Sequence, residues 1–422
     1  MCMRGLRAGL GVVLIAAVAA GCGSGNDART GQSTPNTPVA PEAPTSAPKP
    51  PRQAFDPPKV FEKTAAKFPD GTFFNRDKPR ATLHDGNIYS VDGKGLNAFD
   101  GLTADPLWAV PATVKPSGQD ATSAPFAHQD RIYAAFSGKA PAQGTKPARP
   151  VIELVAVDVK SGKADWSTTI DVDVKDPGNT NDGETSVVGV SDTSVVVTYY
   201  SQDASIGQTF VVDASTHQVR WNKDQFLAGD VDSGVIVGNA GKPFIGEQRS
   251  LTGLAETDGA QKWSTTLGGY GTQIMPLAPK IIGSSRQVYS TADYQFDLID
   301  VTSGKSLYSL PINTSFGAGY RMSCFYDQTS MIVCDGQSER TFAFDVNSIG
   351  AKPMWEITKT TDRVPPSVTA AYHGLVYGTG ANAPVTLDAK TGQDAPDAPG
   401  VAPEMVDKYL AVYKGTSYKP TK

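Results

Sequence analysis

The sequence predicts an all-β protein, an eight-bladed β-propeller with four antiparallel strands per blade, preceded by a disordered tether. Three observations lead to this prediction. Short β-branched runs recur between Gly, Asp and Ser, as in Ser194 to Tyr200 (SVVVTYY) and Met331 to Val333. A pair formed by an Asp and an aromatic residue recurs at a nearly constant interval. Residues 23–54 contain no aromatic residue and a single Val.

Composition excludes several classes of function. Of the 422 residues, 38 are Lys or Arg and 43 are Asp or Glu, a formal charge of −5. No basic run follows the first few residues, so nucleic acid is not an expected partner, because phosphate binding needs a concentrated positive surface. The four Cys and four His are too scattered along the chain for a zinc cluster, and no metal site is predicted.

The N-terminus, residues 1–21, has the organisation of a signal peptide. Arg4 and Arg7 precede an apolar run from Ala8 to Ala20, which is too short to span a bilayer. Small residues then lead to Cys22, and this ending resembles the lipobox of bacterial lipoproteins, although Ala stands three residues before the Cys where Leu is commoner. The resemblance implies that Cys22 carries the lipid; the alternative is an ordinary secretory signal that ends beside a Cys.

Residues 22–54 are expected to be a disordered linker after the lipidated Cys. They are rich in Pro, Thr and Ala and cannot bury enough apolar surface to offset the entropy of ordering. A spacer that holds the folded part clear of the membrane is the favoured interpretation, and a Pro-rich docking motif is the alternative. The propeller is expected to occupy residues 55–422.

The repeat consists of an Asp that ends one strand and an aromatic residue that opens the next, usually eight positions later. The aromatic spacings of 58, 55, 42, 45 and 47 residues are typical of propeller blades. The pairs are Asp100 with Trp108, Asp158 with Trp166, Asp213 with Trp221, Asp300 with Tyr308 and, two residues longer, Asp345 with Trp355. Trp263 follows Ala255, which has Glu256 beside it, and Asp388 opens a last copy with Pro396 in the aromatic place.

Turn chemistry explains this spacing. An Asp at the end of a strand can accept backbone N–H bonds from the following turn, and a Gly four residues later supplies the positive φ of a tight hairpin. The aromatic side chain can then cover the seam to the neighbouring blade. The expected turn glycines are Gly162, Gly259, Gly304 and Gly392. Recurrence in every blade indicates that these Asp residues are structural rather than catalytic.

The number of blades follows from length. The 368 residues from 55 to 422, divided by the late spacing of 47, give about 7.8 blades. The segment from Lys408 to Tyr413 resembles the first strands of another blade, which Pro58 to Phe61 or Thr72 to Asn75 could complete. Eight blades, one of them built from both ends of the chain, are therefore predicted, with seven as the alternative.

The stretch from Ala156 to Trp166 (AVDVKSGKADW) resembles the repeat of the PQQ-like, or quinoprotein-like, β-propellers. The resemblance covers residues 81 to 413. This family includes pyrroloquinoline quinone (PQQ) dehydrogenases and also non-catalytic scaffolds such as the outer-membrane assembly lipoprotein of the BamB type. Together with the lipobox and the tether, the repeats resemble those of actinobacterial surface lipoproteins.

The resemblance leaves enzyme and scaffold to be distinguished. The dehydrogenases of this family grip their quinone with two adjacent Cys and use a calcium site, but no two Cys are adjacent here. The acidic stretch from Asp171 to Glu184 does not have the spacing of a calcium loop. His84, His128 and His373 lie where strands turn, and no nucleophile with a base is evident. No PQQ, metal or catalytic residue is therefore expected.

We thus expect a non-catalytic lipoprotein whose propeller binds envelope proteins on the extracytoplasmic face of the cell membrane. The alternatives are a quinoprotein-type oxidoreductase and a structural protein that binds cell-wall glycan. The partners expected are the membrane, through Cys22, and unidentified envelope proteins.

Cys324 and Cys334 are predicted to form a disulfide. Arg321 to Phe325 and Met331 to Val333 are expected to be neighbouring strands joined by the turn Asp327 to Ser330, which sets the two Cys nearly opposite. Two buried free thiols are the alternative.

The candidate binding surface lies on loops that lead from one blade to the next. Two such loops combine Gly residues with aromatic side chains and one Arg, types that often dominate binding energy. The candidates are Tyr270, Phe316, Tyr320 and Arg321. The alternative is that Tyr270 and Tyr320 only fill the central channel.

Overall fold

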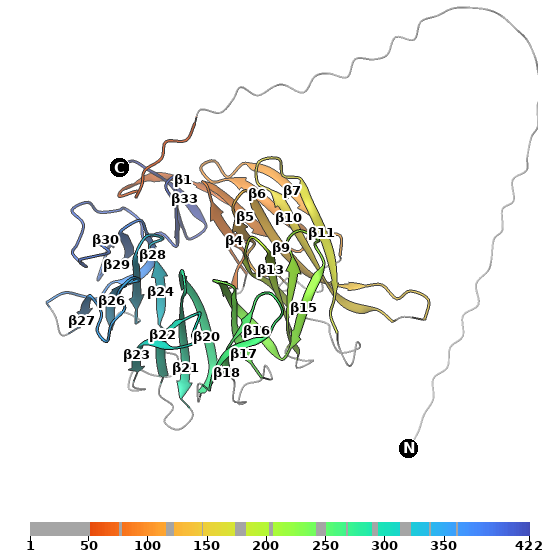
Figure 1. Cartoon of the computed structure of the whole chain (residues 1–422). Coiled ribbons are helices and arrows are strands. Elements are labelled where there is room, and N and C mark those ends of the chain that lie inside the picture. The colour runs from red at the N-terminus through yellow and green to blue at the C-terminus, as the bar shows by residue number, and fades with distance from the viewer. Residues whose placement is uncertain are drawn as a thin grey trace, which may run out of the picture. The chain divides into compact units, whose positions relative to one another are not determined.

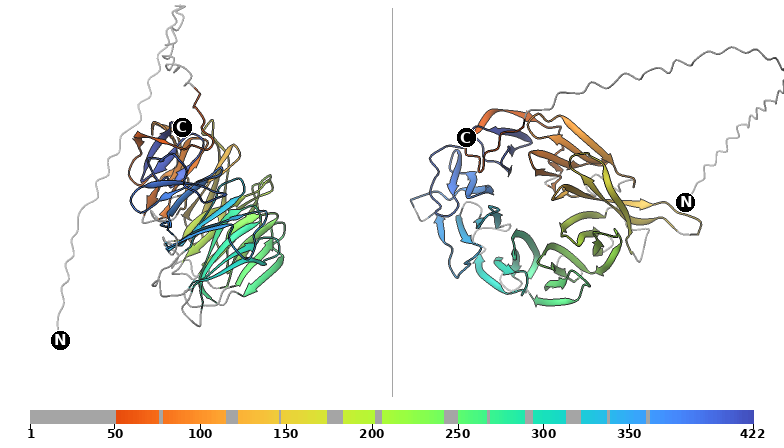
Figure 2. Two further views of the ribbon diagram at one scale, coloured as in Figure 1. Left: turned by 90° about the vertical axis from the view of Figure 1, so that its left-hand side faces the viewer. Right: turned by 45° about the horizontal axis from the view of Figure 1, so that its top comes forward.

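The structure, a computed structural model, describes residues 51–422 apart from 76–77, 115–121, 146, 174–182, 202–205, 242–249, 267–268, 289–293, 313–321, 337–338 and 360–361. Residues Arg52 to Lys422 form one compact unit. Eight sheets follow one another around a ring, and a small two-stranded hairpin accompanies them (Figures 1 and 2). The prediction of an eight-bladed propeller is confirmed, and the alternative of seven blades is wrong.

In blades 1 to 7, strands that follow one another along the chain are hydrogen-bonded neighbours. Blades 1 and 2 contain β4 (Ala81–His84), β5 (Asn87–Val91), β6 (Gly95–Asp100), β7 (Pro106–Pro111), and β8 (Phe126–His128), β9 (Arg131–Ala140), β10 (Arg149–Asp158), β11 (Ala164–Asp171). Blades 3 and 4 contain β12 (Glu184–Val190), β13 (Ser194–Ser201), β14 (Ile206–Asp213), β15 (Val219–Asp224), and β16 (Phe226–Asp232), β17 (Val235–Ala240), β18 (Ser250–Ala255), β19 (Gln261–Thr266).

Blades 5 and 6 contain β20 (Gly269–Ala278), β21 (Ile281–Val288), β22 (Tyr294–Asp300), β23 (Ser306–Ile312), and β24 (Ser323–Tyr326), β25 (Met331–Asp335), β26 (Arg340–Asp345), β27 (Trp355–Thr358). Blade 7 has three strands, β28 (Ser367–Tyr372), β29 (Leu375–Thr379) and β30 (Pro384–Asp388). The first strands of blades 1 to 8 contact one another in order around the ring and form its inner wall (Figure 2).

The apolar pattern of each strand reflects its position in the blade. The second strand β13 (SVVVTYYS) is buried along nearly its whole length, because both faces of a middle strand pack against neighbouring blades. Outer strands such as β23 alternate between exposed and half-buried positions, since only one face meets the next blade. In the described residues, no helix is long and apolar enough to cross a membrane.

The hydrophobic core is divided into eight clusters, and each cluster joins two adjacent blades. The cluster between blades 2 and 3, for example, contains Ile152 and Phe210, and the cluster between blades 8 and 1 contains Ile88 and Leu410. The remaining pairs of neighbours are joined in the same way. Stability therefore depends on blade-to-blade packing.

Blade 8 closes the ring with both ends of the chain. Its strand order is β1 (Phe61–Lys67), β33 (Thr416–Pro420), β32 (Ala411–Tyr413) and β31 (Met405–Val406). In this sheet, Phe61 lies opposite Pro420 and Lys67 opposite Thr416. The expected closure through both termini is confirmed, but the strand supplied by the N-terminus starts where one of the two expected segments ends. The other expected segment contributes β2 (Phe74–Asn75), which pairs instead with β3 (Lys78–Pro79).

Blade 7 differs from the expected four strands. Its repeat has Pro396 in the aromatic place, and Pro399 and Pro403 follow. Because proline has no N–H to donate, this segment cannot form a regular outer strand. Among the described residues, the isolated pairing of Leu387 with Asp394, a bond from Ala395 N to Thr386 O and a bond from Asp388 N to Gln393 O connect the chain after the turn to β30.

Candidate functional site

The turn between the third and fourth strands of a blade is organised by the repeated Asp. Asp158 Oδ1 accepts a hydrogen bond of 2.7 Å from Ser161 N, and Gly162 N donates to Asp158 O. Gly162 has φ +66°. Asp100, Asp213, Asp300, Asp345 and Asp388 likewise accept backbone N–H bonds two or three residues ahead. In all these blades the repeated Asp is engaged in its own turn.

Asp213 has an additional ionic partner. Arg220 Nη2 lies 2.6 Å from its Oδ2, and Ser215 donates to its Oδ1 through both N–H and O–H. The Arg220 guanidinium, followed by these hydrogen bonds, holds the pKa of Asp213 far below its usual range. This carboxylate is therefore charged at all physiological pH values.

The repeated Trp connects its own blade to the next one. Its indole Nε1 donates to the carbonyl of the residue that follows the Asp position in the next blade. The four bonds are Trp108 to Val159 O at 3.2 Å, Trp221 to Glu256 O at 2.9 Å, Trp263 to Val301 O at 2.8 Å and Trp355 to Ala389 O at 2.8 Å. The polar edge of each ring is satisfied while its flat body closes the seam between blades.

Each of these indole rings lies on the turn glycine of the next blade. A Cβ at Gly304 would lie 2.5 Å from ring carbons of Trp263, and one at Gly162 would lie 2.3 Å from Cγ of Trp108. Gly259 and Gly392 have the same relation to the preceding Trp. The sequence predicted positive φ at these glycines but not this second reason for a residue without a side chain.

His217 occupies the glycine place in blade 3. It adopts φ +59°, and its imidazole stacks on Trp166 at 4.4 Å between ring centroids, with 13° between the planes. A stacked aromatic side chain can therefore take the place of the glycine backbone that packs under the indole in other blades. In blade 6, where the place is taken by Ile349, Tyr308 packs on Phe344 at 4.6 Å.

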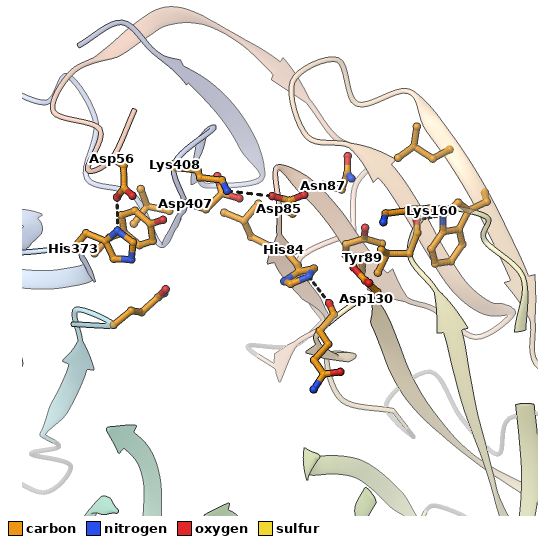
Figure 3. A pocket seen from close by; sticks show the side chains of 18 of the residues that line it. Asp56, His84, Asp85, Asn87, Tyr89, Asp130, Lys160, His373, Asp407 and Lys408 are labelled. Carbon is orange, nitrogen blue, oxygen red and sulfur yellow. Dashed lines mark hydrogen bonds and ion pairs between the residues drawn. The ribbon is translucent and has the colours of Figure 1, made fainter. Parts of the chain in front are cut away.

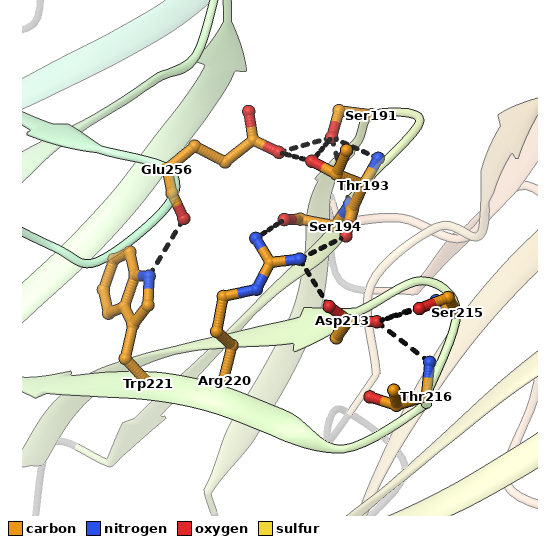
Figure 4. A network of polar contacts seen from close by, with 9 residues as sticks. All are labelled: Ser191, Thr193, Ser194, Asp213, Ser215, Thr216, Arg220, Trp221 and Glu256. Carbon is orange, nitrogen blue, oxygen red and sulfur yellow. Dashed lines mark hydrogen bonds and ion pairs between the residues drawn. The ribbon is translucent and has the colours of Figure 1, made fainter.

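Blade 4 lacks the turn Asp, and the neighbouring Glu256 has a different role there. Its Oε1 accepts hydrogen bonds from the hydroxyls of Ser191 and Thr193 in the first turn of blade 3, the latter at 2.9 Å (Figure 4). Arg220 bonds Ser194 Oγ and Thr193 O in the same turn. The figure shows these side chains in one polar network that joins blades 3 and 4.

A cavity of about 1000 Å³ opens at the end of the ring where first strands turn into second strands. Third strands turn into fourth strands at the same end, because successive strands are antiparallel. Five consecutive blades, from 6 through 8 to 1 and 2, supply its walls (Figure 3). The lining includes Leu83, His84, Asp85, Asn87, Tyr89, Leu107, Trp108, Gln129, Asp130, Val159, Lys160, Ser161, Gln328, Tyr372, His373, Val406, Asp407 and Lys408.

Two of the three turn histidines lie in this cavity wall. His84 Nε2 is 3.0 Å from Gln129 O, a contact between blades 1 and 2, and His373 Nδ1 contacts Asp56. His128 does not line the cavity, and its Nε2 is buried without a hydrogen-bond partner among the described residues. The sequence placed these histidines where strands turn but did not indicate the contacts of His84 and His373, because the two partners come from another blade and from the N-terminus.

The wall formed by blade 8 carries a half-buried carboxylate. Asp407 Oδ2 accepts a bond of 2.6 Å from Gly86 N, and its Oδ1 accepts bonds from Tyr409 N and Leu410 N. Burial nevertheless raises the pKa of Asp407 above its usual value. Beside it, Lys408 Nζ lies 3.7 Å from Asp85 Oδ1. Blades 8 and 1 are thus joined at the cavity by polar contacts as well as by their apolar cluster.

Residues 52–60, here called the strap, lie against three blades before β1 begins. Arg52 Nη2 lies 3.0 Å from Asp100 Oδ2 and 2.8 Å from Asn87 Oδ1 in blade 1. Phe55 N donates to Lys408 O in blade 8, and the Tyr377 hydroxyl in blade 7 donates to Pro58 O. These contacts hold Asp56 at the cavity edge, facing His373 (Figure 3).

The inner wall of the ring contains a second cavity of about 330 Å³. Ala81, Ala370 and Ala371 give it small walls, and Phe325 and Tyr326 add aromatic surface. Glu404 and Met405 of blade 8 complete it with Thr82. Leu83, Gln328 and Val406 line both cavities, so the two adjoin.

The structure describes the predicted binding residues only in part. Tyr270 is part of β20, where its backbone pairs with Gln287. Phe316, Tyr320 and Arg321 lie outside the described residues. The loops between blades leave the opposite end of the strands from the cavity of about 1000 Å³. No local pattern could have indicated that cavity, because its residues come from turns far apart in the sequence.

Cys324 and Cys334 lie opposite each other in β24 and β25, and their Sγ atoms are joined in a disulfide of 2.08 Å. Cys22 lies outside the described residues, as does most of the acidic stretch from Asp171 to Glu184. Among the residues that the structure does describe, no three His, Cys, Asp or Glu side chains are grouped so that they could hold a metal ion.

Comparison with known proteins finds a likeness to one family over part of the chain. Residues 72–225 match the family model described as outer membrane protein assembly factor BamB. No curated protein sequence matches the chain significantly.

Three solved structures are similar to this chain at low identity. The quinohemoprotein alcohol dehydrogenase ADHIIG of Pseudomonas putida HK5 is 13% identical over 81% of this chain and 71% of its own, with a TM-score of 0.46. A europium-containing methanol dehydrogenase is 11% identical over 84% and 81%, with a TM-score of 0.43. KlHsv2 with loop 6CD replaced by a Gly-Ser linker is 8% identical over 73% and 91%, with a TM-score of 0.41. Identities and TM-scores this low carry no inference about function.

Proposed function

We propose that this PQQ-like β-propeller is a non-catalytic scaffold that binds other proteins on the extracytoplasmic face of the cell membrane. The observation that carries the proposal is the cavity of about 1000 Å³, whose walls come from five blades of a closed ring. A ring without open edges holds these walls in fixed positions, which favours binding by a preformed surface. The family model that matches residues 72–225 is itself described as an assembly factor.

The chain's own cysteines support a binding role over quinone chemistry. A quinone grip of the kind implied by the resemblance needs two adjacent Cys, and no two Cys are adjacent in this sequence. Cys324 and Cys334 are instead paired with each other across two strands. The residues present therefore do not fit that cofactor.

The membrane anchor is part of the proposal and has its own test. Diacylation of Cys22 would supply two acyl chains, which is what stable anchoring requires. We expect Cys22→Ala to move the protein from the membrane fraction to the soluble fraction or the medium. Cys2→Ala is the matched control, because Cys2 lies in the signal peptide, and this variant should stay with the membrane. Retention of Cys22→Ala in the membrane would contradict the anchor.

The scaffold role can be tested by site-specific photo-cross-linking in cells. A photoreactive amino acid at Leu107 or Gln129 places the probe on the cavity wall. The control position is Met354, which is 57% exposed and does not line the cavity. We expect protein adducts from the two wall positions and none of the same mass from Met354. Retention of the protein on cell-wall polymer, with no wall-specific protein adduct, would instead indicate a glycan-binding protein.

A further inference from the structure

The two adjoining cavities form one site with different chemistry at its mouth and its floor. The mouth, at the turn end of the ring, is lined mostly by polar and charged side chains. The floor, on the inner wall, is lined mostly by Ala, aromatic and aliphatic side chains, together with Thr82, Gln328 and Glu404. With about 330 Å³, the floor has room for ~10 water molecules and therefore for one large side chain.

The charges of this site are unbalanced. In the part of the chain that the structure describes, its lining contains five carboxylates, namely Asp56, Asp85, Asp130, Asp407 and Glu404, against the two ammonium groups of Lys160 and Lys408. Lys408 lies beside Asp85, so one of the two cations is already paired within the wall. Of the carboxylates, Asp85 and Asp130 both lie on exposed turns. A ligand that enters the mouth therefore meets a surplus of negative charge.

The site also offers apolar surface, which favours a ligand that has an apolar side chain as well as charges. Leu107 on the cavity wall is 43% exposed, an unusual exposure for a large apolar side chain in this protein. Its neighbour Trp108 also lines the mouth. Burying one aromatic side chain of a ligand on such surfaces removes ~150–250 Å² from water, and buried aromatic anchors dominate many interfaces.

We infer that the site binds an extended segment of a partner protein in which one large apolar side chain is flanked by Lys or Arg. The apolar side chain would occupy the floor between Ala370 and Phe325, and the cations would face Asp130 and its neighbours at the mouth. This inference rests on the proposed scaffold function and names the chemistry of the partner segment. Charge complementarity selects a basic segment, and the size of the floor selects a single large side chain.

Binding of three labelled peptides to the full chain tests the inference by fluorescence anisotropy. The first peptide is Gly-Lys-Lys-Trp-Lys-Lys-Gly, the second has Glu in place of each Lys, and the third has Ala in place of Trp. We expect the first to bind at least about tenfold more tightly than either of the others, because each contribution is worth ~1.4 kcal/mol or more. Tighter binding of the Glu peptide, or equal binding of all three, would overturn the inference.

Two protein variants locate the binding. Asp130→Lys reverses a charge at the mouth, and Asp362→Lys makes the same change at an exposed position outside both cavities. We expect Asp130→Lys to weaken binding of the Lys-Trp peptide by about tenfold and Asp362→Lys to weaken it by less than about twofold. Equal effects of the two variants would show only general attraction to an acidic protein and would also overturn the inference.

Failure of the basic-segment inference can be distinguished from failure of the proposed scaffold function. Photo-cross-links at Leu107 and Gln129 with a partner whose contacting segment is acidic would leave the scaffold function standing and refute the basic segment. Absence of any wall-specific adduct would refute the scaffold function itself.

Discussion

The contact between Trp263 and Gly304 can be tested by adding a single methyl group. Gly304→Ala places a Cβ at 2.5 Å from ring carbons of Trp263, closer than nonbonded carbons can lie, at φ +69°. The backbone conformation alone costs an Ala ~1–2 kcal/mol. Displacement of the indole adds ~1–3 kcal/mol of overpacking and endangers the Trp263 Nε1 bond to Val301 O, worth ~1 kcal/mol. We expect Gly304→Ala to lower the free energy of unfolding by ~2–5 kcal/mol.

A matched substitution separates the clash from the backbone cost. Gly234 has φ +71°, almost the same as Gly304, but a Cβ there would meet no atom within 4 Å. Gly234→Ala should therefore cost only the ~1–2 kcal/mol of the left-handed conformation. The difference between the two variants in free energy of unfolding measures the cost of displacing the Trp263 indole.

Urea unfolding of the full chain, followed by circular dichroism, gives both values, and Trp fluorescence reports the displaced indole. In a Trp263→Ala background the excess cost of Gly304→Ala should disappear, since the ring that clashes is gone. If Gly304→Ala and Gly234→Ala destabilise equally, or if the excess persists without the indole, the argument that the ring lies on this glycine is refuted.

Three further predictions follow from the described residues. Burial, with Asp232 nearby, raises the pKa of Asp230 to about 6. Because the folded pKa lies above the unfolded one, the wild-type protein loses stability as pH rises from about 4 through 6. In urea titrations, Asp230→Asn should therefore be more stable than wild type at pH 7 by up to ~3 kcal/mol and equally stable near pH 4. Replacing Cys324 and Cys334 together by Ser should lower the free energy of unfolding by ~2–3 kcal/mol, and alkylation of both thiols in the unfolded, unreduced protein would contradict the bond. Truncation after Gly400 removes β31, β32 and β33 and should yield insoluble protein, whereas a soluble product with native circular dichroism would contradict closure through the C-terminus.

The sequence predicted those parts of the fold that repeat. Each blade has its own copy of the Asp and aromatic pair, so the turns and the outer strands could be located from local residue types alone. β1 was harder, because Phe61 to Lys67 (FEKTAAK) has neither β-branched enrichment nor alternation. It is a strand because β33 of the same blade is available for pairing, which is information from the other end of the chain.

The candidate site was not predictable from the sequence for the same reason. His373 and Asp56 are 317 positions apart, and Gly86 and Asp407 are 321 apart. Such pairs carry no local signal, and only the closed ring brings them together. Loop residues such as Tyr270, in contrast, can be proposed from local residue types, and a binding surface at these loops stays a prediction.

Closure of the ring by both ends has a consequence for synthesis on the ribosome. The N-terminal strand β1 emerges early, but Thr416, the partner of Lys67, follows 349 residues later. At ~5–20 residues per second, β1 waits roughly 20–70 s for its neighbour. Throughout that time the growing chain has an unpaired strand at its start and an uncovered blade at its end, both prone to association with other chains. The exposed strand edges are therefore covered only when about the last twenty residues have been made. Chaperones that shield nascent chains would need to protect the N-terminal strand of this protein for the longest time.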